Sequence, residues 1–343
     1  MQNEIVQAGA LLDSKGLLSQ KGYSKKMLLE YDRNSVKANP MKIKEWDYYL
    51  IYNDSYALAL TIADNSYMGL DSVSLIDFTE PWQRTTSYMR AFPKGRTNLP
   101  TSSSAGDTRV KGKNYTIWFK NNGKSRRIMC HMDSFINSNP IDADISILDE
   151  PEESMVIATP FKKRKKAFYY NQKINCMRAH GIVRFENKEY IFSPEDSFAT
   201  LDWGRGVWTY KNTWYWGSAS GLVNGERFGF NIGYGFGDTS NASENMLFYK
   251  GKAHKLSQVK FNIPKKRVKL DYMSLWTFTS DDGRFEMNFE PIIDRYANTN
   301  AILIGSKQHQ VFGLFNGKAV LDDGTIIKVS DFLGFAEKVS NRW

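Results

Sequence analysis

The chain is poor in the residues that build metal centres and disulfide frameworks. Its 343 residues include two cysteines and four histidines. Cys130 and Cys176 are far apart and fit no metal-ligand spacing, and each stands in an apolar or strand-like stretch where a buried free thiol is expected. The histidines are scattered without the spacing of zinc ligands. The sequence therefore predicts neither a metal nor a cofactor.

Long hydrophobic runs are also missing. No stretch approaches the roughly 20 apolar residues that a membrane-spanning helix needs, and the first residues lack the basic and apolar regions of a signal peptide. The glycine-rich 233–237 segment is not followed by the strand–helix context of a dinucleotide fingerprint. From these absences we predict that the chain has no transmembrane segment. We also predict a cytoplasmic location, which is usual for a chain with reduced thiols.

Acidic residues are fewer than basic ones, 37 against 46, so the net charge is +9. The excess is spread along the chain, so it favours solubility and allows weak contact with an anionic membrane surface. The five consecutive basic residues at 162–166 predict an exposed loop. No aromatic residues interleave with them, which argues against nucleic acid as a partner. The basic run 264–269 resembles a nuclear import signal, but it lies between strand patterns and reads as a solvated turn.

Aromatic residues, by contrast, are abundant at 14% of the chain, a share that suits strands better than helices. Short aromatic and β-branched runs alternate with turn signals such as 53–55, 121–123 and 224–225, which predict hairpins. Regular turns with little helical period predict an all-β meander closed into a barrel. Two halves of similar style predict two consecutive antiparallel β-barrels, over residues 1–160 and 161–343. The segment 330–343 fits either a terminal strand or a capping helix.

The hairpin predicted at Asn224–Gly225 sets the register of its two strands. Because side chains alternate along a strand, one face pairs Trp216 with Gly233, Trp214 with Gly235 and Ser218 with Asn231. Large indoles beside bare glycines leave space for a ligand inside a barrel, which predicts a cavity in the second barrel. The alternative is that the indoles lie over the glycines only to protect the backbone.

The long strand predicted over 167–185 places three polar groups on one face, namely Asn171, Lys173 and Asn175. On an open sheet this is a solvated face. Inside a barrel, burial of amides and an ammonium costs several kcal/mol unless each finds a partner. Proteins that retain such groups often use them for binding or catalysis.

The segment 201–210 combines an acid, a base and aromatic residues. Asp202 is the favoured proton donor, because desolvation among aromatic rings raises the pKa of a carboxyl. The alternative is a local ion pair between Asp202 and Arg205 that holds the loop. Glu244 and Glu290 are the next candidates.

Several stretches together resemble the uncharacterised bacterial family of domain of unknown function 2804. They are 43–49, 168–175, 201–206, 233–238 with Glu244–Asn245, and 341–343. That family is distantly similar to the lipocalin-like hydratases and cyclases. The resemblance implies two calycin-type β-barrels, an isoprenoid-like or lipid-like ligand, and a buried acid that protonates an alkene.

The first hypothesis is therefore a cofactor-independent hydratase, cyclase or isomerase that acts on a small hydrophobic molecule. Asp202, with Arg205 and Glu244, forms the expected catalytic group, and indole faces shield a cationic intermediate. The expected ligand-binding residues are Asn171, Lys173, Asn175, Trp203, Trp208, Trp214, Trp216 and Asn231. A lipid carrier without chemistry is the second hypothesis, and a carbohydrate-binding protein is the third. The sequence leaves the oligomeric state open.

Overall fold

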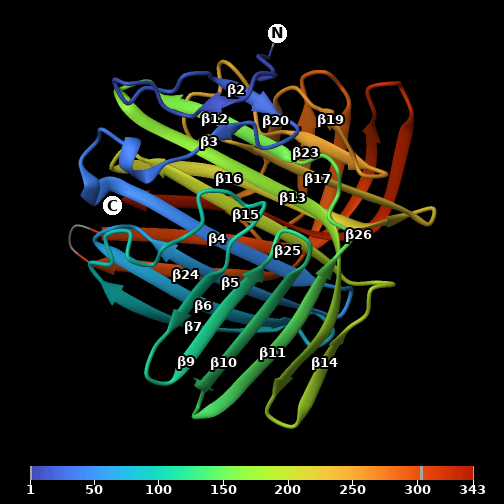
Figure 1. Ribbon diagram of the computed structural model, residues 1–343. Coiled ribbons are helices and arrows are strands. Elements are labelled where there is room, and N and C mark those ends of the chain that lie inside the picture. The colour runs from blue at the N-terminus through green and yellow to red at the C-terminus, as the bar shows by residue number, and fades with distance from the viewer. Residues whose placement is uncertain (1, 302–303, 343) are drawn as a thin grey trace.

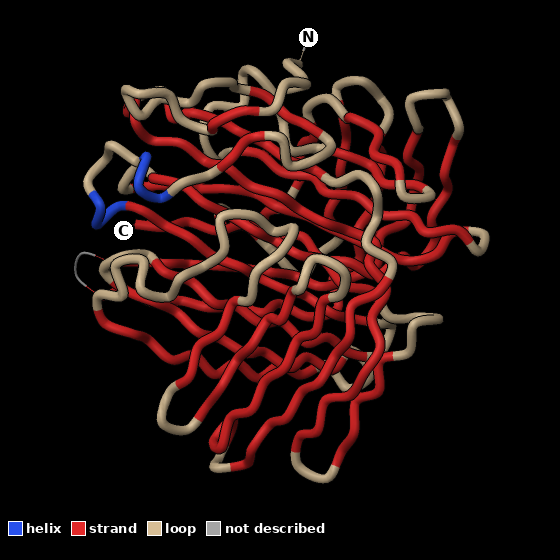
Figure 2. Tube along the Cα trace, viewed as in Figure 1, coloured by secondary structure: helices blue, strands red, loops and turns tan. Residues whose placement is uncertain are grey.

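The computed structural model describes residues 2–301 and 304–342 and is built almost wholly of strands. Figure 2 shows the strands in red, with helix confined to two short turns before β4. Within the described part of the chain, no helix is long and apolar enough to cross a membrane. The all-β prediction is confirmed.

Two large antiparallel sheets make up the molecule, each curled into a half-barrel (Figure 1). The first sheet follows the order β7-β6-β5-β4-β15-β13-β11-β10-β9-β8, with β2, β12 and β14 attached to it. The second follows β19-β18-β17-β16-β26-β25-β24-β23-β20. Two small pairs, β1–β3 and β21–β22, complete the fold.

The elements of the first half are β1 (Gly9–Ala10), β2 (Gly22–Ser24), β3 (Leu29–Glu30), η1 (Arg33–Ser35), η2 (Pro40–Lys42), β4 (Ile43–Tyr52), β5 (Tyr56–Asp64), β6 (Met68–Asp77), β7 (Trp82–Ala91), β8 (Thr108–Lys111), β9 (Tyr115–Asn121), β10 (Arg126–Ile136), β11 (Asn139–Leu148), β12 (Met155–Phe161), β13 (Arg164–Phe185), β14 (Lys188–Phe192) and β15 (Phe198–Val207).

Those of the second half are β16 (Lys211–Val223), β17 (Glu226–Tyr234), β18 (Met246–Tyr249), β19 (Lys252–Lys255), β20 (Val259–Asn262), β21 (Lys265–Lys266), β22 (Lys269–Leu270), β23 (Trp276–Ser280), β24 (Phe285–Ala301), β25 (Ile304–Val320) and β26 (Ile326–Arg342).

The sheets divide the chain later than the predicted boundary at residues 160 and 161. Strands β13, β14 and β15 all belong to the first sheet, and the chain passes to the second sheet between Val207 and Lys211. The basic run at 162–166 instead spans the β12–β13 turn and is exposed. A run of like charges predicts a solvent-exposed segment, and a hairpin turn is as exposed as a linker between domains.

The predicted hairpins at 53–55, 121–123 and 224–225 all form. The segment 330–342 continues β26 as a strand, and residue 343 lies outside the described residues. The long strand is present as β13, which runs across the molecule in Figure 1. It has a bulge between Ile174 and Met177, where Cys176 takes a φ of 60°. The bulge re-aims the side chains that follow it.

The interior of the second half-barrel is filled by its own side chains. Its core holds one face of the β16–β17 hairpin together with phenylalanines from later strands. The residues of that face are Tyr215, Ala219, Phe228, Phe230 and Ile232. Rings pack in contact there, as Phe230 does with Phe285 and Phe315 at 5.0 Å between centroids. The prediction of a hollow second barrel is therefore wrong. Phenylalanine has the volume to fill a narrow barrel and no polar atom to satisfy.

The two half-barrels meet face to face in a layer that we call the seam. Strands β4, β13 and β15 form one wall, and β16, β25 and β26 form the other. A cluster of buried apolar side chains joins the walls, with Tyr48 and Leu50 on one side and Trp216, Phe312 and Phe335 on the other. Strand β15 is consequently buried along its whole length, on both faces. Any charge on this strand must find a partner within the protein.

Candidate functional site in the seam

The aromatic–glycine face of the β16–β17 hairpin forms part of the seam. The predicted pairs Trp216–Gly233 and Ser218–Asn231 are observed in the ladder. This face, however, points away from the lumen of the second half-barrel and toward the first sheet. Trp216 is buried against Tyr48 and Phe335, at 6.0 and 4.7 Å between ring centroids. The predicted cavity wall is thus a packed contact between the two halves.

The polar face of β13 meets Asp202 in the seam. Lys173 lies opposite Asp202 in the ladder, and its Nζ is 2.9 Å from Oδ1 of that carboxylate. Asn171 donates to the same oxygen at 2.6 Å. Lys173 Nζ also stands 4.1 Å from the centroid of the Trp216 ring. The lysine is buried, and its nearest partners are one carboxylate and one indole face.

Glu337 on β26 is the second carboxylate of the seam. Its Oε1 accepts from Trp214 Nε1 at 3.0 Å, and its Oε2 accepts from Gln310 Nε2 at 3.1 Å. Burial raises the pKa of this carboxyl to about 7, against the lowering effect of the Trp214 hydrogen bond and of the positive charges on Arg295 and Lys173. Near neutral pH, Glu337 can therefore hold or release a proton.

Glu244 is a third buried carboxylate in the same region. Burial raises its pKa, the charge on Lys173 lowers it, and the charge on Asp202 raises it again. Asn231 connects it to the hairpin, because its side chain accepts from Trp216 Nε1 at 2.7 Å and donates to the Glu244 backbone carbonyl at 2.7 Å. A Cβ at Gly233 would lie 3.1 Å from Glu244 Oε1, so this glycine leaves room for a carboxylate.

Several buried polar atoms of the seam lack a hydrogen-bond partner among the described residues. They are Tyr48 Oη, Asn171 Oδ1, Asn175 Oδ1, Thr200 Oγ1 and Gln310 Oε1, together with Trp208 Nε1 and Arg295 Nε. An unmade hydrogen bond in a dry interior costs about 1–3 kcal/mol. The three amide oxygens are acceptors, the hydroxyls of Thr200 and Tyr48 can donate or accept, and Trp208 Nε1 and Arg295 Nε are donors. The seam therefore holds both hydrogen-bond acceptors and donors whose bonding capacity is unused.

An aromatic cluster borders the Glu337 side of the seam. The ring of Phe236 packs edge-on against Tyr169, Trp208 and Trp214, with centroids 4.7, 4.8 and 5.3 Å away. Trp46 stacks on Tyr169 and meets Trp208 edge to face. Trp214 carries the Glu337 hydrogen bond, so the acid lies at the edge of an aromatic surface.

Trp203 and Arg205 do not share a site with Asp202, because odd and even positions of β15 point to opposite faces. Arg205 is fully buried in the first half-barrel, pairs with Asp47 at 3.0 Å, and donates to the Pro100 carbonyl at 2.8 Å. The sequence alternative of an Asp202–Arg205 ion pair is therefore wrong. The expectation that Trp203 shields the same intermediate as Trp216 is corrected too, since the guanidinium of Arg205 stacks on its ring at 4.2 Å.

Gly204 gives a direct test of the packing that supports the seam. A Cβ built there would lie 1.9 Å from the Trp46 ring. Gly204→Ala is expected to push this indole off the sheet and to lower the free energy of unfolding by about 1–3 kcal/mol. Gly9→Ala is the control, because nothing lies within 4 Å of its Cβ position. Urea denaturation measures both; equal effects would contradict the packing described.

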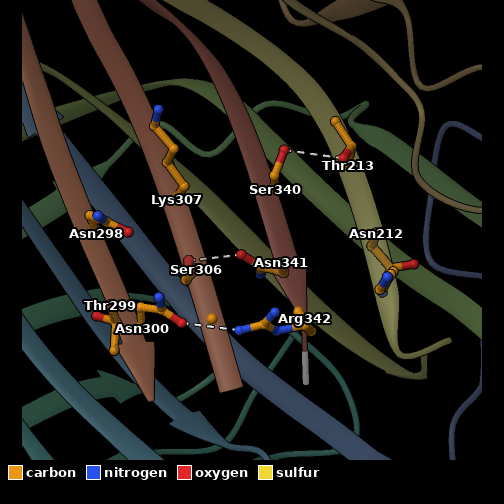
Figure 3. Close-up of a pocket in the computed structure, with 12 residues that line it drawn as sticks. Asn212, Thr213, Asn298, Thr299, Asn300, Ser306, Lys307, Ser340, Asn341 and Arg342 are labelled. Carbon is orange, nitrogen blue, oxygen red and sulfur yellow. Dashed lines mark hydrogen bonds between the residues drawn. The ribbon is translucent and has the colours of Figure 1, made fainter. Parts of the chain in front are cut away.

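A cavity of about 390 Å³ opens where the seam strands end (Figure 3). Amides, hydroxyls and basic side chains from β16, β24, β25 and β26 line it. Ser306 donates to Asn341 Oδ1 at 2.7 Å across its floor. Asn341 and Glu337 are four residues apart on β26, so they share a face about 13 Å apart. Gln308 lies between, with its Nε2 3.4 Å from Glu337 Oε2.

Sequence reasoning found one wall of the seam and missed much of the other. The structure brings together Asn171, Lys173, Asn175, Asp202, Trp208, Trp214, Trp216, Asn231 and Glu244. It adds Glu337, Gln310 and Tyr48 to them. A lone acid inside the apolar run 332–339 was the available signal for Glu337. Glu290, the remaining acid candidate, pairs with Leu314 in the β24–β25 ladder of the second sheet.

Comparison with known proteins agrees with the resemblance drawn from the sequence. The family model described as "Domain of unknown function (DUF2804)" matches residues 2–343. No curated protein matches the chain.

Solved structures match the chain at low sequence identity, and the first of them shares its fold. The "putative AttH" from Nitrosomonas europaea is 13% identical, covers 90% of this chain and 96% of its own, and has a TM-score of 0.57. Kievitone hydratase from Nectria haematococca is 10% identical over 88% of each chain, with a TM-score of 0.48. CghA with Sch210972 is 9% identical over 97% of each chain, with a TM-score of 0.44. The prediction of a tandem lipocalin-like fold is confirmed.

Proposed function

The chain belongs to the family of domain of unknown function 2804, and we propose that it is a cofactor-independent acid–base catalyst of the hydratase, cyclase or isomerase class. Its substrate would be a small molecule with an apolar body and hydroxyl or amine groups. The observation that carries this proposal is Glu337, a buried carboxyl with a pKa of about 7 beside an aromatic cluster. A general acid works best when its pKa lies near the working pH.

Glu337 is a better proton donor in this scheme than Asp202, the acid favoured by the sequence. Asp202 is held by an ion pair with Lys173 and a hydrogen bond from Asn171, so its carboxylate is already engaged. Glu337 receives neutral donors from Trp214 and Gln310, and burial outweighs the lowering effect of the Trp214 hydrogen bond so that its pKa is raised to about 7. We assign Glu337 the transfer of the proton and Asp202 the role of a fixed negative charge.

Proton transfer to an alkene or enol moves the pair of π electrons to the incoming hydrogen and leaves a cation on carbon. The nearby ring faces of Trp214 and Trp216 would stabilise that cation. Water or an internal hydroxyl would then capture it, and the proton lost from the captured oxygen would return to Glu337. The negative charge on Asp202 favours the cation further, while Lys173 limits this effect.

The unpartnered acceptors of the seam support the substrate class. Asn171 Oδ1, Asn175 Oδ1 and Gln310 Oε1 could each accept from a hydroxyl of the guest. The cavity at the strand ends has a polar lining suited to the same kind of group. Access from that cavity to Glu337 would require Gln308 to swing aside, since its amide lies between them.

Incubation in D₂O tests the proposal before any substrate has been identified. Pools of phenols and alcohols that carry alkenyl groups are incubated with the protein and examined by mass spectrometry. We expect one class of compounds to gain the mass of D₂O, or to gain deuterium on carbon while changing retention time. Recovery of a bound compound without any deuterium on carbon would instead indicate a carrier and contradict the catalytic proposal.

A further inference from the structure

The β21–β22 hairpin is a basic projection with an apolar tip. Lys265, Lys266, Arg267 and Lys269 are exposed along it, and Val268 at its tip is 89% exposed. Met273 and Leu275, just after the hairpin, are 48% and 55% exposed. The nearby Asp271 is engaged locally, since it accepts from the Ser274 hydroxyl and the Met273 amide. Val268 is thus an exposed apolar side chain flanked in the chain by the basic residues Arg267 and Lys269.

This hairpin is joined to the rim of the cavity by stacked rings. Tyr272 lies flat on His309, with 3.7 Å between ring centroids and 7° between planes. His309 pairs with Lys338 across the β25–β26 ladder and is two residues from Lys307, which lines the cavity. The spacing of alternate residues on a strand is about 7 Å. Stacked rings thus connect the hairpin to the strand that carries Lys307, and His309 between them pairs with Asp294 Oδ2 at 2.6 Å.

The cavity mouth carries the same charge. Lys211, Lys307 and Arg342 line it, and no aspartate or glutamate stands among its described lining residues. Tyr296, on the neighbouring strand β24, is 44% exposed. Tyrosine is favoured at the boundary between lipid head groups and water.

We propose that this face docks on an anionic lipid bilayer, with Val268, Met273 and Leu275 inserted among the head groups and the cavity mouth held against the membrane. Basic side chains near an anionic surface add about 1 kcal/mol each, or roughly fivefold in partitioning. Apolar residues that dip into the interface add to this attraction. The proposal goes beyond the catalytic one, because docking needs no chemistry, and it gives the protein direct access to molecules dissolved in the bilayer.

Lipid fits this surface better than nucleic acid does. RNA binding would call for aromatic faces between the basic residues so that bases can stack, whereas the tip offers aliphatic and thioether side chains. The exposed basic run at 162–166 supplies a matched control, because it has comparable charge and its neighbour Phe161 is buried.

Sedimentation with vesicles tests the proposal on the full chain. Vesicles of phosphatidylcholine with about a quarter phosphatidylglycerol should bind the protein, and vesicles of phosphatidylcholine alone should bind it at least tenfold more weakly. Val268→Asp and the pair Lys266→Glu with Lys269→Glu should each weaken binding about tenfold or more. Lys163→Glu with Lys165→Glu should change binding less than threefold.

Three outcomes would overturn the docking surface. The first is equal loss from the hairpin variants and the 163/165 variant, which would mean that net charge alone drives adsorption. The second is full binding by Val268→Asp. The third is no binding to anionic vesicles, with or without tight binding to a short RNA. Circular dichroism of each variant establishes that it is folded before it is compared.

Discussion

Replacement of Glu337 by glutamine is expected to lower kcat by about 10²–10⁴-fold, the usual contribution of a general acid. Glutamine keeps the shape and one acceptor oxygen for Trp214 Nε1, but it has no proton of suitable acidity to give. A flip of the Gln310 amide would offer its free Oε1 to the new amide group. The variant should therefore fold, and the loss should fall on chemistry. Single-turnover rates with the compound identified in D₂O measure it.

The pH dependence of the wild-type enzyme provides the sharper test of the Glu337 assignment. A pKa of about 7 in the free enzyme predicts that wild-type kcat/KM is level below pH 6 and falls about tenfold per pH unit well above pH 7. Glu286→Gln is the control, because Glu286 is a half-exposed carboxylate on β24 that pairs with Lys318. Full activity in Glu337→Gln would refute the assignment of the acid.

Folding stability should respond to Glu337 in the opposite sense to an ordinary carboxylate. The pKa is raised from 4.5 to about 7 in the folded protein, so the stabilising contribution is complete below pH 4.5 and is lost as the pH rises through 7. The full shift corresponds to about 3 kcal/mol. The unfolding free energy of the wild type minus that of Glu337→Gln should therefore decrease as the pH rises from 4.5 to 8. If Glu337 were an ionised residue with a purely structural role, this difference would increase with pH.

Replacement of Lys173 by methionine is expected to lower the free energy of unfolding by about 3–5 kcal/mol. The substitution leaves Asp202 as a buried carboxylate whose partner charge is gone, and an uncompensated buried charge is strongly destabilising. Methionine retains most of the side-chain volume against Trp216, so a cavity contributes little. Chemical denaturation at pH 7 measures the loss.

A matched pair on the surface sets the scale for this result. Lys318 and Glu286 are 2.8 Å apart, and both side chains are about half exposed. Lys318→Met should therefore cost less than about 1 kcal/mol. The double variant Lys173→Met with Asp202→Leu should recover part of the loss, because neither charge is then left alone. If Lys173→Met were no more harmful than Lys318→Met, the ion pair would not stabilise the seam.

Local signals were sufficient for the strands and their pairing. The turn at Asn224–Gly225 fixed the register that places Trp216 opposite Gly233 and Ser218 opposite Asn231, because a two-residue turn leaves no freedom in the ladder. Alternation along the strand likewise grouped Asn171, Lys173 and Asn175. These are short-range properties of the backbone, so one sequence suffices to predict them.

The sequence by itself therefore determined an all-β chain, its hairpins, and which side chains share a face. Only the tertiary structure decided where each face points. It turned Trp216 and Lys173 toward each other across the seam, filled the second half-barrel with phenylalanine, and sent Arg205 to Asp47. It also brought Glu337, more than a hundred residues from Asp202 in the chain, into the same buried layer. The reason is physical: alternation assigns a residue to a face, whereas burial and pairing of charge depend on which sheet packs against that face.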